Sequence, residues 1–203
     1  MNYLAHIYLS GENKKIVIGN FIADSIRGKQ YKTYEPQIQI GILLHRAIDT
    51  FTDAHPIVRQ STKRLHKNYS HYSGVIVDIL YDHFLAKNWE KYSSIPLDIY
   101  VENFYDNLEQ HFKILPNRVQ RLLPHMISEN WLLSYAEIDG IQKVLDGMNR
   151  RTKFKSGMNK ATFELITFYE AFENEFTDFF KELINFTNIK LDELKSLDLK
   201  KHE

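Results

Sequence analysis

The chain contains no cysteine among its 203 residues. Disulfides and thiolate metal sites are therefore excluded, and any bound metal must be held by His, Asp or Glu. An excess of charge is also missing, because 26 Lys and Arg balance 26 Asp and Glu. A neutral chain gives no electrostatic reason to expect binding to nucleic acid or to a membrane surface.

Long apolar runs are absent as well. No stretch approaches the ~18 uncharged apolar residues of a membrane-spanning helix. The first residues, MNYLAHIYLSGENKK, lack the basic start and the small-residue cleavage site of a signal peptide. We therefore expect a cytoplasmic protein that has neither a membrane nor a nucleic acid as its partner.

Proline and glycine are scarce, with five and eight copies, and they lie near expected helix ends. Apolar residues between them recur at helical spacing, and no strict alternation is long enough for a sheet. Four prolines suit the first turn of a helix. The sequence predicts an all-α, single-domain bundle of about ten helices over residues 1–203. The expected helices are 2–9, 14–26, 36–53, 56–67, 71–91, 97–114, 117–131, 135–149, 159–185 and 189–198.

The helix expected at 36–53 carries a polar row on the side opposite its main apolar stripe. His45, Asp49 and Asp53 follow one another at intervals of four and so share a face. Two isoleucines begin the same row, so this face is expected to be partly enclosed, and enclosed carboxylates need hydrogen bonds, cations or a metal. Arg46 lies beside the row, where its planar guanidinium could hold a phosphoryl group. A surface ion pair is an equal alternative for Arg46.

The helix expected at 71–91 has two aspartates, Asp78 and Asp82, within an otherwise apolar face. Two anions on one buried face repel, and a divalent cation would relieve that repulsion. Each aspartate could instead cap a neighbouring helix or pair with a buried arginine. Two aligned aspartates beside a second His/Asp row favour the metal. His83 points about 100° away from Asp82, and a metal role for it is an even choice.

Four motifs occur in order along the chain: MNYLAHIYLS, GNFIAD, GILLHRAIDTFTDAHP and VDILYDHFLAKNW. Together they resemble the acyl carrier protein phosphodiesterases, and the chain length and helical pattern agree with that family. The resemblance implies a relative of the helical HD phosphohydrolases. It further implies a manganese-dependent enzyme that hydrolyses the phosphodiester between 4′-phosphopantetheine and a serine of holo-acyl carrier protein. Mg²⁺ and Fe²⁺ are the alternative metals.

The resemblance and the two polar rows together define the predicted site. The catalytic candidates are Asp24, His45, Arg46, Asp49, Asp53, Asp78 and Asp82. The metal candidates are Asp24, His45, Asp49, Asp78, Asp82 and His83, and His6 and Asn20 are further candidates from the resemblance. This chain has Asp82 before His83, whereas an ordinary HD motif has His before Asp, so the ligands of each metal stay open.

A basic stretch near the middle of the chain suggests a docking surface. Arg150, Arg151, Lys153 and Lys155 lie in a segment that contains no acid. Acyl carrier proteins are strongly acidic, and a local basic patch on a neutral protein suits one acidic partner better than polyanions in general. A solvated helix end is the equal alternative. Arg118 and Arg121 form a smaller basic pair on another expected helix.

Two other functions remain open at this point. The protein could be a metal-dependent phosphohydrolase that acts on another small phosphoester or on a nucleotide. It could also be a non-catalytic helical adaptor for an acidic protein. The enclosed carboxylate rows argue against the adaptor, because a binding module has no reason to bury anions.

Overall fold

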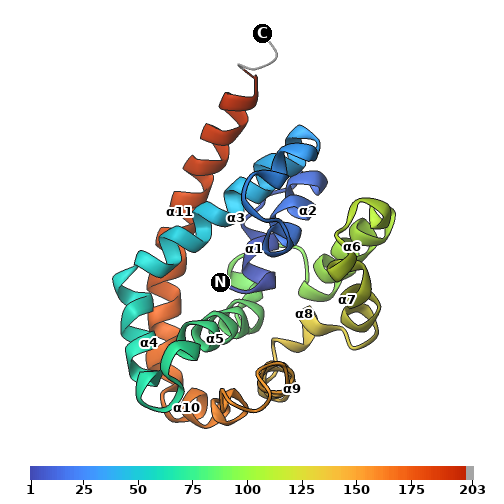
Figure 1. The fold of residues 1–203 in the computed structure, drawn as a ribbon. Helices are drawn as coiled ribbons and strands as arrows, with labels where there is room; N and C mark the ends of the chain where they lie inside the picture. The colour runs from blue at the N-terminus through green and yellow to red at the C-terminus, as the bar shows by residue number, and fades with distance from the viewer. Residues whose placement is uncertain (200–203) are drawn as a thin grey trace.

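The computed structural model describes residues 1–199, in which every regular element is a helix, and this confirms the all-α prediction (Figure 1). Residues 200–203 of the predicted domain lie outside the described residues. The α-helices of this part are α1 Tyr3–Tyr8, α2 Lys14–Ile22, α3 Pro36–Ala54, α4 Pro56–Tyr69, α5 Ser73–Lys87, α6 Leu97–Gln110, α7 Asn117–Ser128, α8 Trp131–Ser134, α9 Ile138–Arg151, α10 Thr162–Thr167 and α11 Tyr169–Leu199.

Most helix ends follow the sequence signals, but the predicted helices are wrong in two places. Pro36 and Pro56 occupy the first turn of α3 and α4, where a missing N–H costs nothing. The first is the helix predicted at 117–131: Pro124 lies inside α7, which ends at Ser128, and the separate α8 follows Asn130, whose φ is positive. The second is the C-terminal third, where the sequence predicts helices at 159–185 and 189–198. The structure instead has the short α10 followed by α11, which continues to Leu199 because no proline or glycine interrupts it. Within residues 1–199, no helix has both the length and the apolar character needed to cross a membrane.

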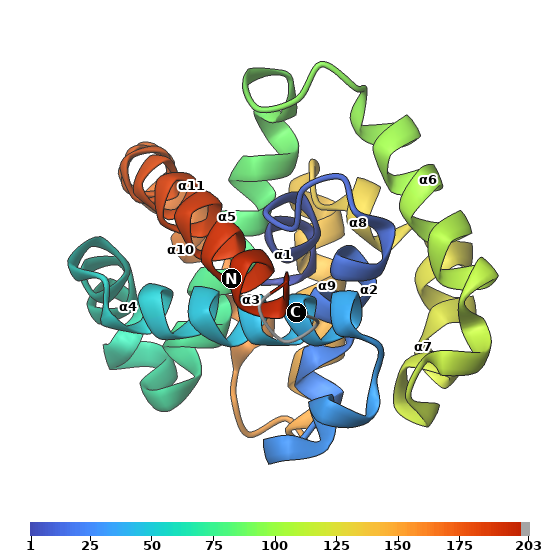
Figure 2. The ribbon, with the colours of Figure 1, turned by 90° about the horizontal axis from the view of Figure 1, so that it is seen from above.

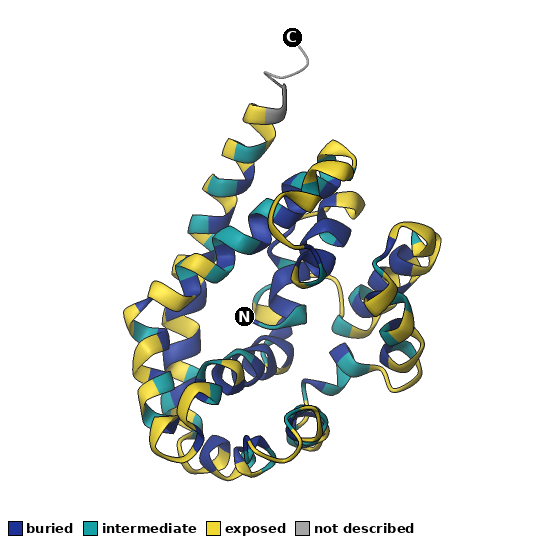
Figure 3. Cartoon of the chain, in the orientation of Figure 1, coloured by how far each residue is buried: buried dark blue, intermediate teal, exposed yellow. Residues whose placement is uncertain are grey.

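The core is continuous and centres on α5 and α11. Nearly all side chains of α5 after its first turn are buried, as Figure 3 shows. Four phenylalanines of α11 stack against this core, namely Phe172, Phe176, Phe179 and Phe180. α11 packs across α3, α4 and α5, and the view from above shows this crossing (Figure 2). The short α1 packs against both α2 and α5.

Two glycines allow α2 and α3 to touch. A Cβ atom added at Gly19 would lie 2.2 Å from the carbonyl oxygen of Ile38, and one added at Gly41 would lie 2.1 Å from that of Ile16. No side chain larger than hydrogen fits at either position without moving a backbone. This close approach places the C-terminal end of α2 directly beside the middle of α3.

Candidate metal site

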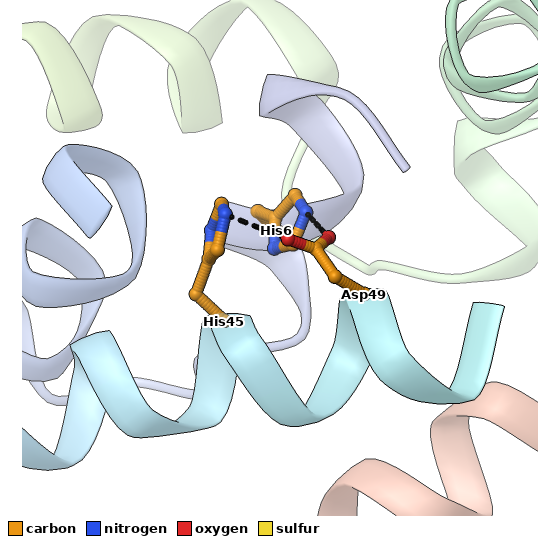
Figure 4. A group of neighbouring side chains, drawn as sticks. All are labelled: His6, His45 and Asp49. Carbon is orange, nitrogen blue, oxygen red and sulfur yellow. Dashed lines mark ion pairs between the residues drawn. The ribbon is translucent and has the colours of Figure 1, made fainter. Parts of the chain in front are cut away.

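Three side chains converge where α1 meets α3 (Figure 4). His6 comes from α1, and His45 and Asp49 lie one turn apart on α3. The two oxygens of Asp49 face the two rings, since Oδ1 lies 3.2 Å from His6 Nε2 and Oδ2 lies 3.1 Å from His45 Nε2. The rings stack with their centroids 4.0 Å apart. The Asp49 carboxylate thus places one oxygen next to each imidazole.

Asp24 adds a second carboxylate to this cluster. It lies in the short 3-10 helix Ala23–Ser25 that directly follows α2, and its Oδ1 is 3.3 Å from His45 Nε2. The side chain of Asp24 is 64% exposed, whereas both histidines are buried. Asp24 therefore forms the solvent-facing side of the cluster.

Asn20 determines which ring nitrogen carries the proton when the two histidines are neutral. Its Nδ2 donates to the backbone carbonyl of His6 at 3.0 Å and to Ser10 Oγ at 2.8 Å, and a carbonyl can only accept. The orientation of the amide follows, so its Oδ1 faces the rings. Oδ1 lies 2.9 Å from His6 Nδ1 and 3.0 Å from His45 Nδ1, and both nitrogens must donate to it. The Nε2 lone pairs of the neutral rings are then directed toward the carboxylates, as metal-binding histidines require.

The charges within the cluster oppose one another. Burial would lower the pKa of His45, but hydrogen bonds to Asp24 and Asp49 and their charges raise this pKa to about 9. Burial and then the neighbouring His45 lower the pKa of His6 to about 4. Burial would raise the pKa of Asp49, yet both histidines hold it below its ordinary value. One proton on His45 therefore neutralises part of the charge of two aspartates.

These donors fit a divalent cation. Carboxylate oxygens suit Mg²⁺ and Mn²⁺, imidazole nitrogens suit Fe²⁺ and Zn²⁺, and a set of both without sulfur is typical of divalent-metal sites. His6 Nε2 is buried and faces Asp49, but it makes no hydrogen bond with suitable geometry in the described part of the chain. A cation among His6, His45 and Asp49 would use that nitrogen and replace the proton that His45 carries.

We expect the metal-free protein to lose stability as the pH rises from ~6.5 toward 9. The raised pKa of His45 stabilises the fold below ~6.5, and this contribution is lost as the pH rises toward 9. Below ~6.5 two buried groups oppose each other. The lowered pKa of His6 makes the protein less stable as the pH falls toward 4, whereas the pKa of Asp82, raised to about 7, makes it more stable over the same range. Urea unfolding between pH 6.5 and 9, with chelator present, measures the contribution of His45.

The matched variant for this prediction is His45→Gln, which cannot titrate. Between pH 6.5 and 9 the free energy of unfolding of this variant should fall by about 1–3 kcal/mol less than that of the wild type. An equal fall in the two proteins would show that His45 is not the group responsible.

The structure does not bring the aspartates of α5 into this cluster. Asp82 is fully buried, and its two oxygens accept from the backbone N–H groups of Leu4 at 2.7 Å and Ala5 at 3.2 Å. It thus caps the first turn of α1, where the N-cap side chain of Asn2 makes no such bond. Asp78 Oδ1 accepts from the amino group of Met1 at 2.9 Å. Asp82 thus takes the capping alternative that the sequence left open, whereas Asp78 forms an ion pair with the amino group of Met1, which precedes α1.

The other predicted residues also lie outside the cluster. His83 Nδ1 donates to the carbonyl of Tyr135 at 2.8 Å, and its Nε2 is 2.9 Å from the hydroxyl of Tyr169, so the ring faces away from Asp82. Arg46 donates to the carbonyl of Ile26 at 3.1 Å. Asp53 is exposed and lines a groove along α4; Asp78 lines this groove and also a cavity that Asp24 lines.

A cavity of about 620 Å³ lies beside Asp24. It is large enough for a small ligand or for the flexible arm of a larger one. Its walls come from α5, α7, α8, α9 and the N-terminal residues. They combine apolar side chains with four cations, Arg118, Lys143, Arg150 and Arg151, and with three carboxylates, Asp24, Asp78 and Glu129. Lys153 and Lys155 are exposed in the loop that follows α9. The sequence offered no signal for this cavity, because helices far apart in the chain build it.

The chain is similar throughout most of its length to one family. The family model described as acyl carrier protein phosphodiesterase matches residues 1–183. A protein of that name from Yersinia pestis is 32% identical over 186 residues, which cover 91% of this chain and 96% of the relative. Its namesake from Escherichia coli O6:H1 is 32% identical over 187 residues, with the same two coverages. No solved structure gives a significant match.

Proposed function

The chain belongs to the acyl carrier protein phosphodiesterase family, and from this we propose that it releases 4′-phosphopantetheine from holo-acyl carrier protein. Water would add to phosphorus, the bond to the serine oxygen would break, and that oxygen would take up a proton. The products would be the apo-carrier and 4′-phosphopantetheine. We propose a cytoplasmic location for this reaction.

One observation supports a metal role more than any other: the pair of imidazoles that Asn20 orients toward Asp49. We propose that His6, His45, Asp49 and Asp24 hold Mn²⁺, with Mg²⁺ or Fe²⁺ as alternatives. When bound, such a cation polarises a phosphoryl oxygen and lowers the pKa of bound water. Asn20 keeps both rings in the required tautomer.

The roles of the other predicted residues follow from their contacts. Asp82 would support the site through α1, which carries His6, because it caps the first turn of this helix, and Asp78 would hold Met1 two residues before the helix begins. His83 and Arg46 make hydrogen bonds elsewhere, and Asp53 lies in the α4 groove. We therefore leave these three out of the proposed metal set.

The loop after α9 supports carrier docking. Lys153 and Phe154 have positive φ angles of 54° and 62°, which non-glycine residues rarely adopt. In this turn 72% of the surface of Phe154 is exposed, and the lysines on either side of it in the sequence are exposed as well. An apolar tip flanked by cations suits an acidic protein that also offers an apolar contact. We propose that Lys153 and Lys155 face the carrier, while Arg150 and Arg151, at the end of α9, lie between this docking surface and the cavity that they line.

The test is the conversion of holo-carrier to apo-carrier, followed by mass spectrometry. Chelator-treated protein should be inactive, and added Mn²⁺ should restore the loss of the prosthetic group. Mg²⁺ and Fe²⁺ in parallel reactions identify the preferred metal, and nucleotides and simple phosphodiesters test the other substrate classes. Intact holo-carrier after incubation with folded protein and saturating Mn²⁺ would contradict the proposal.

A further inference from the structure

Two arginines of the cavity beside Asp24 come from different helices. Arg118 lies at the start of α7, and Arg151 ends α9. Among the described side chains of residues 1–197 neither forms an ion pair, and the hydrogen bond of Arg151 is a 3.5 Å contact with Met148 Sδ. Two guanidinium groups without a directly paired carboxylate therefore line one cavity, which Asp24, Asp78 and Glu129 also line.

Tyr3 and Asp24 line the same cavity as the two arginines. The Asp24 carboxylate of the metal site and the two guanidinium groups therefore open onto one space. The pKa of Tyr3 agrees with this arrangement: burial raises it most, the negative charge of Asp24 raises it further, and the positive charges of Arg151 and Arg118 lower it.

A substrate phosphate needs such a pair. A phosphodiester is an anion, and Asp24 and Asp49 repel it from the cluster side. Positive groups on the cavity side offset this repulsion, and the planar guanidinium group matches two phosphate oxygens at once. Lys153 and Lys155 do not line the cavity and cannot fill this role.

We propose that Arg118 and Arg151 bind the phosphate of the substrate next to Asp24, so their main task is not carrier docking. This inference rests on the proposed phosphodiesterase function. It assigns the pantetheine arm to the remainder of the cavity, where Val75, Trp131 and Val144 offer apolar walls. Lys153 and Lys155 are left to contact the carrier.

Arg118→Gln and Arg151→Gln test the assignment, and Arg121→Gln is the matched control. Arg121 is exposed on the same helix as Arg118 but does not line the cavity. Bis(4-nitrophenyl) phosphate is a phosphodiester without a carrier. Each cavity variant should lower kcat/KM for this compound by about 10- to 100-fold, because a charge-assisted hydrogen bond is lost. The control should stay within about twofold of the wild type, as for surface changes in general.

Calorimetric binding of inorganic phosphate gives a readout that needs no turnover. Each cavity variant should bind phosphate at least about tenfold more weakly than the wild type and the control. If both variants bind phosphate normally and impair only the holo-carrier, the two arginines dock the carrier and the inference is overturned. A wild type that binds phosphate through these arginines but hydrolyses neither substrate would instead contradict the proposed function.

Discussion

Asp49→Ala is expected to abolish phosphodiester hydrolysis, with kcat lower by about 10³-fold or more, while the protein stays folded. Asp49 is the carboxylate that faces both histidines, with oxygens 3.2 Å from His6 Nε2 and 3.1 Å from His45 Nε2. Without it, the two imidazoles lose their shared anion and a cation loses its central ligand. Metal-stabilised charge is worth several kcal/mol in the transition state, and each 1.36 kcal/mol changes the rate about tenfold.

Two measurements check this prediction. Calorimetric titration of the chelator-treated protein with Mn²⁺ should show loss of binding in Asp49→Ala, and circular dichroism should show an unchanged helix content. The comparison variant is Asp53→Ala, one turn further along α3, which the structure leaves outside the cluster. Wild-type Mn²⁺ affinity in Asp49→Ala would exclude the proposed metal site. Equal losses in both variants would show that the polar row extends to Asp53.

Helical spacing predicts which residues share a face, and here it placed His45 and Asp49 together. The same rule placed Asp78 and Asp82 on one face of α5, and it could not say what that face meets. In the structure it meets the first turn of α1, whose free N–H groups need acceptors. The sequence therefore predicts that the two aspartates share a face. It does not predict their partners, which lie 77 or more positions away in the chain.

His6 and Asn20 illustrate a second limit. Nothing in their local pattern distinguishes them, and only the family resemblance suggested either residue. Their roles arise from the close packing of α2 on α3, which brings Asn20 within 3.0 Å of His45, and from the position of α1. Such pairings depend on the tertiary fold. The all-α architecture, in contrast, follows from apolar periodicity and the scarcity of proline and glycine.

Asp82→Ala is expected to lower the free energy of unfolding by about 2–4 kcal/mol. The change removes both acceptors of the Leu4 and Ala5 N–H groups and leaves two buried donors unpaired, at about 1–3 kcal/mol each. Burial raises the pKa of Asp82 to about 7, so the cost of keeping a carboxylate in the core offsets part of this loss.

Urea unfolding and Mn²⁺ titration together distinguish a capping role from a ligand role for Asp82. As a cap, Asp82→Asn should retain one acceptor and lose less stability than Asp82→Ala, and well below its unfolding midpoint it should still bind Mn²⁺. His6 follows Ala5 by one residue and Leu4 by two, so a weakened cap displaces His6 only slightly. This displacement should weaken Mn²⁺ binding by less than about tenfold, far less than Asp49→Ala does. If Asp82 were a metal ligand, Asp82→Asn would lose Mn²⁺ binding with little change in stability, because the amide oxygen can still cap α1 but carries no charge to offer the cation.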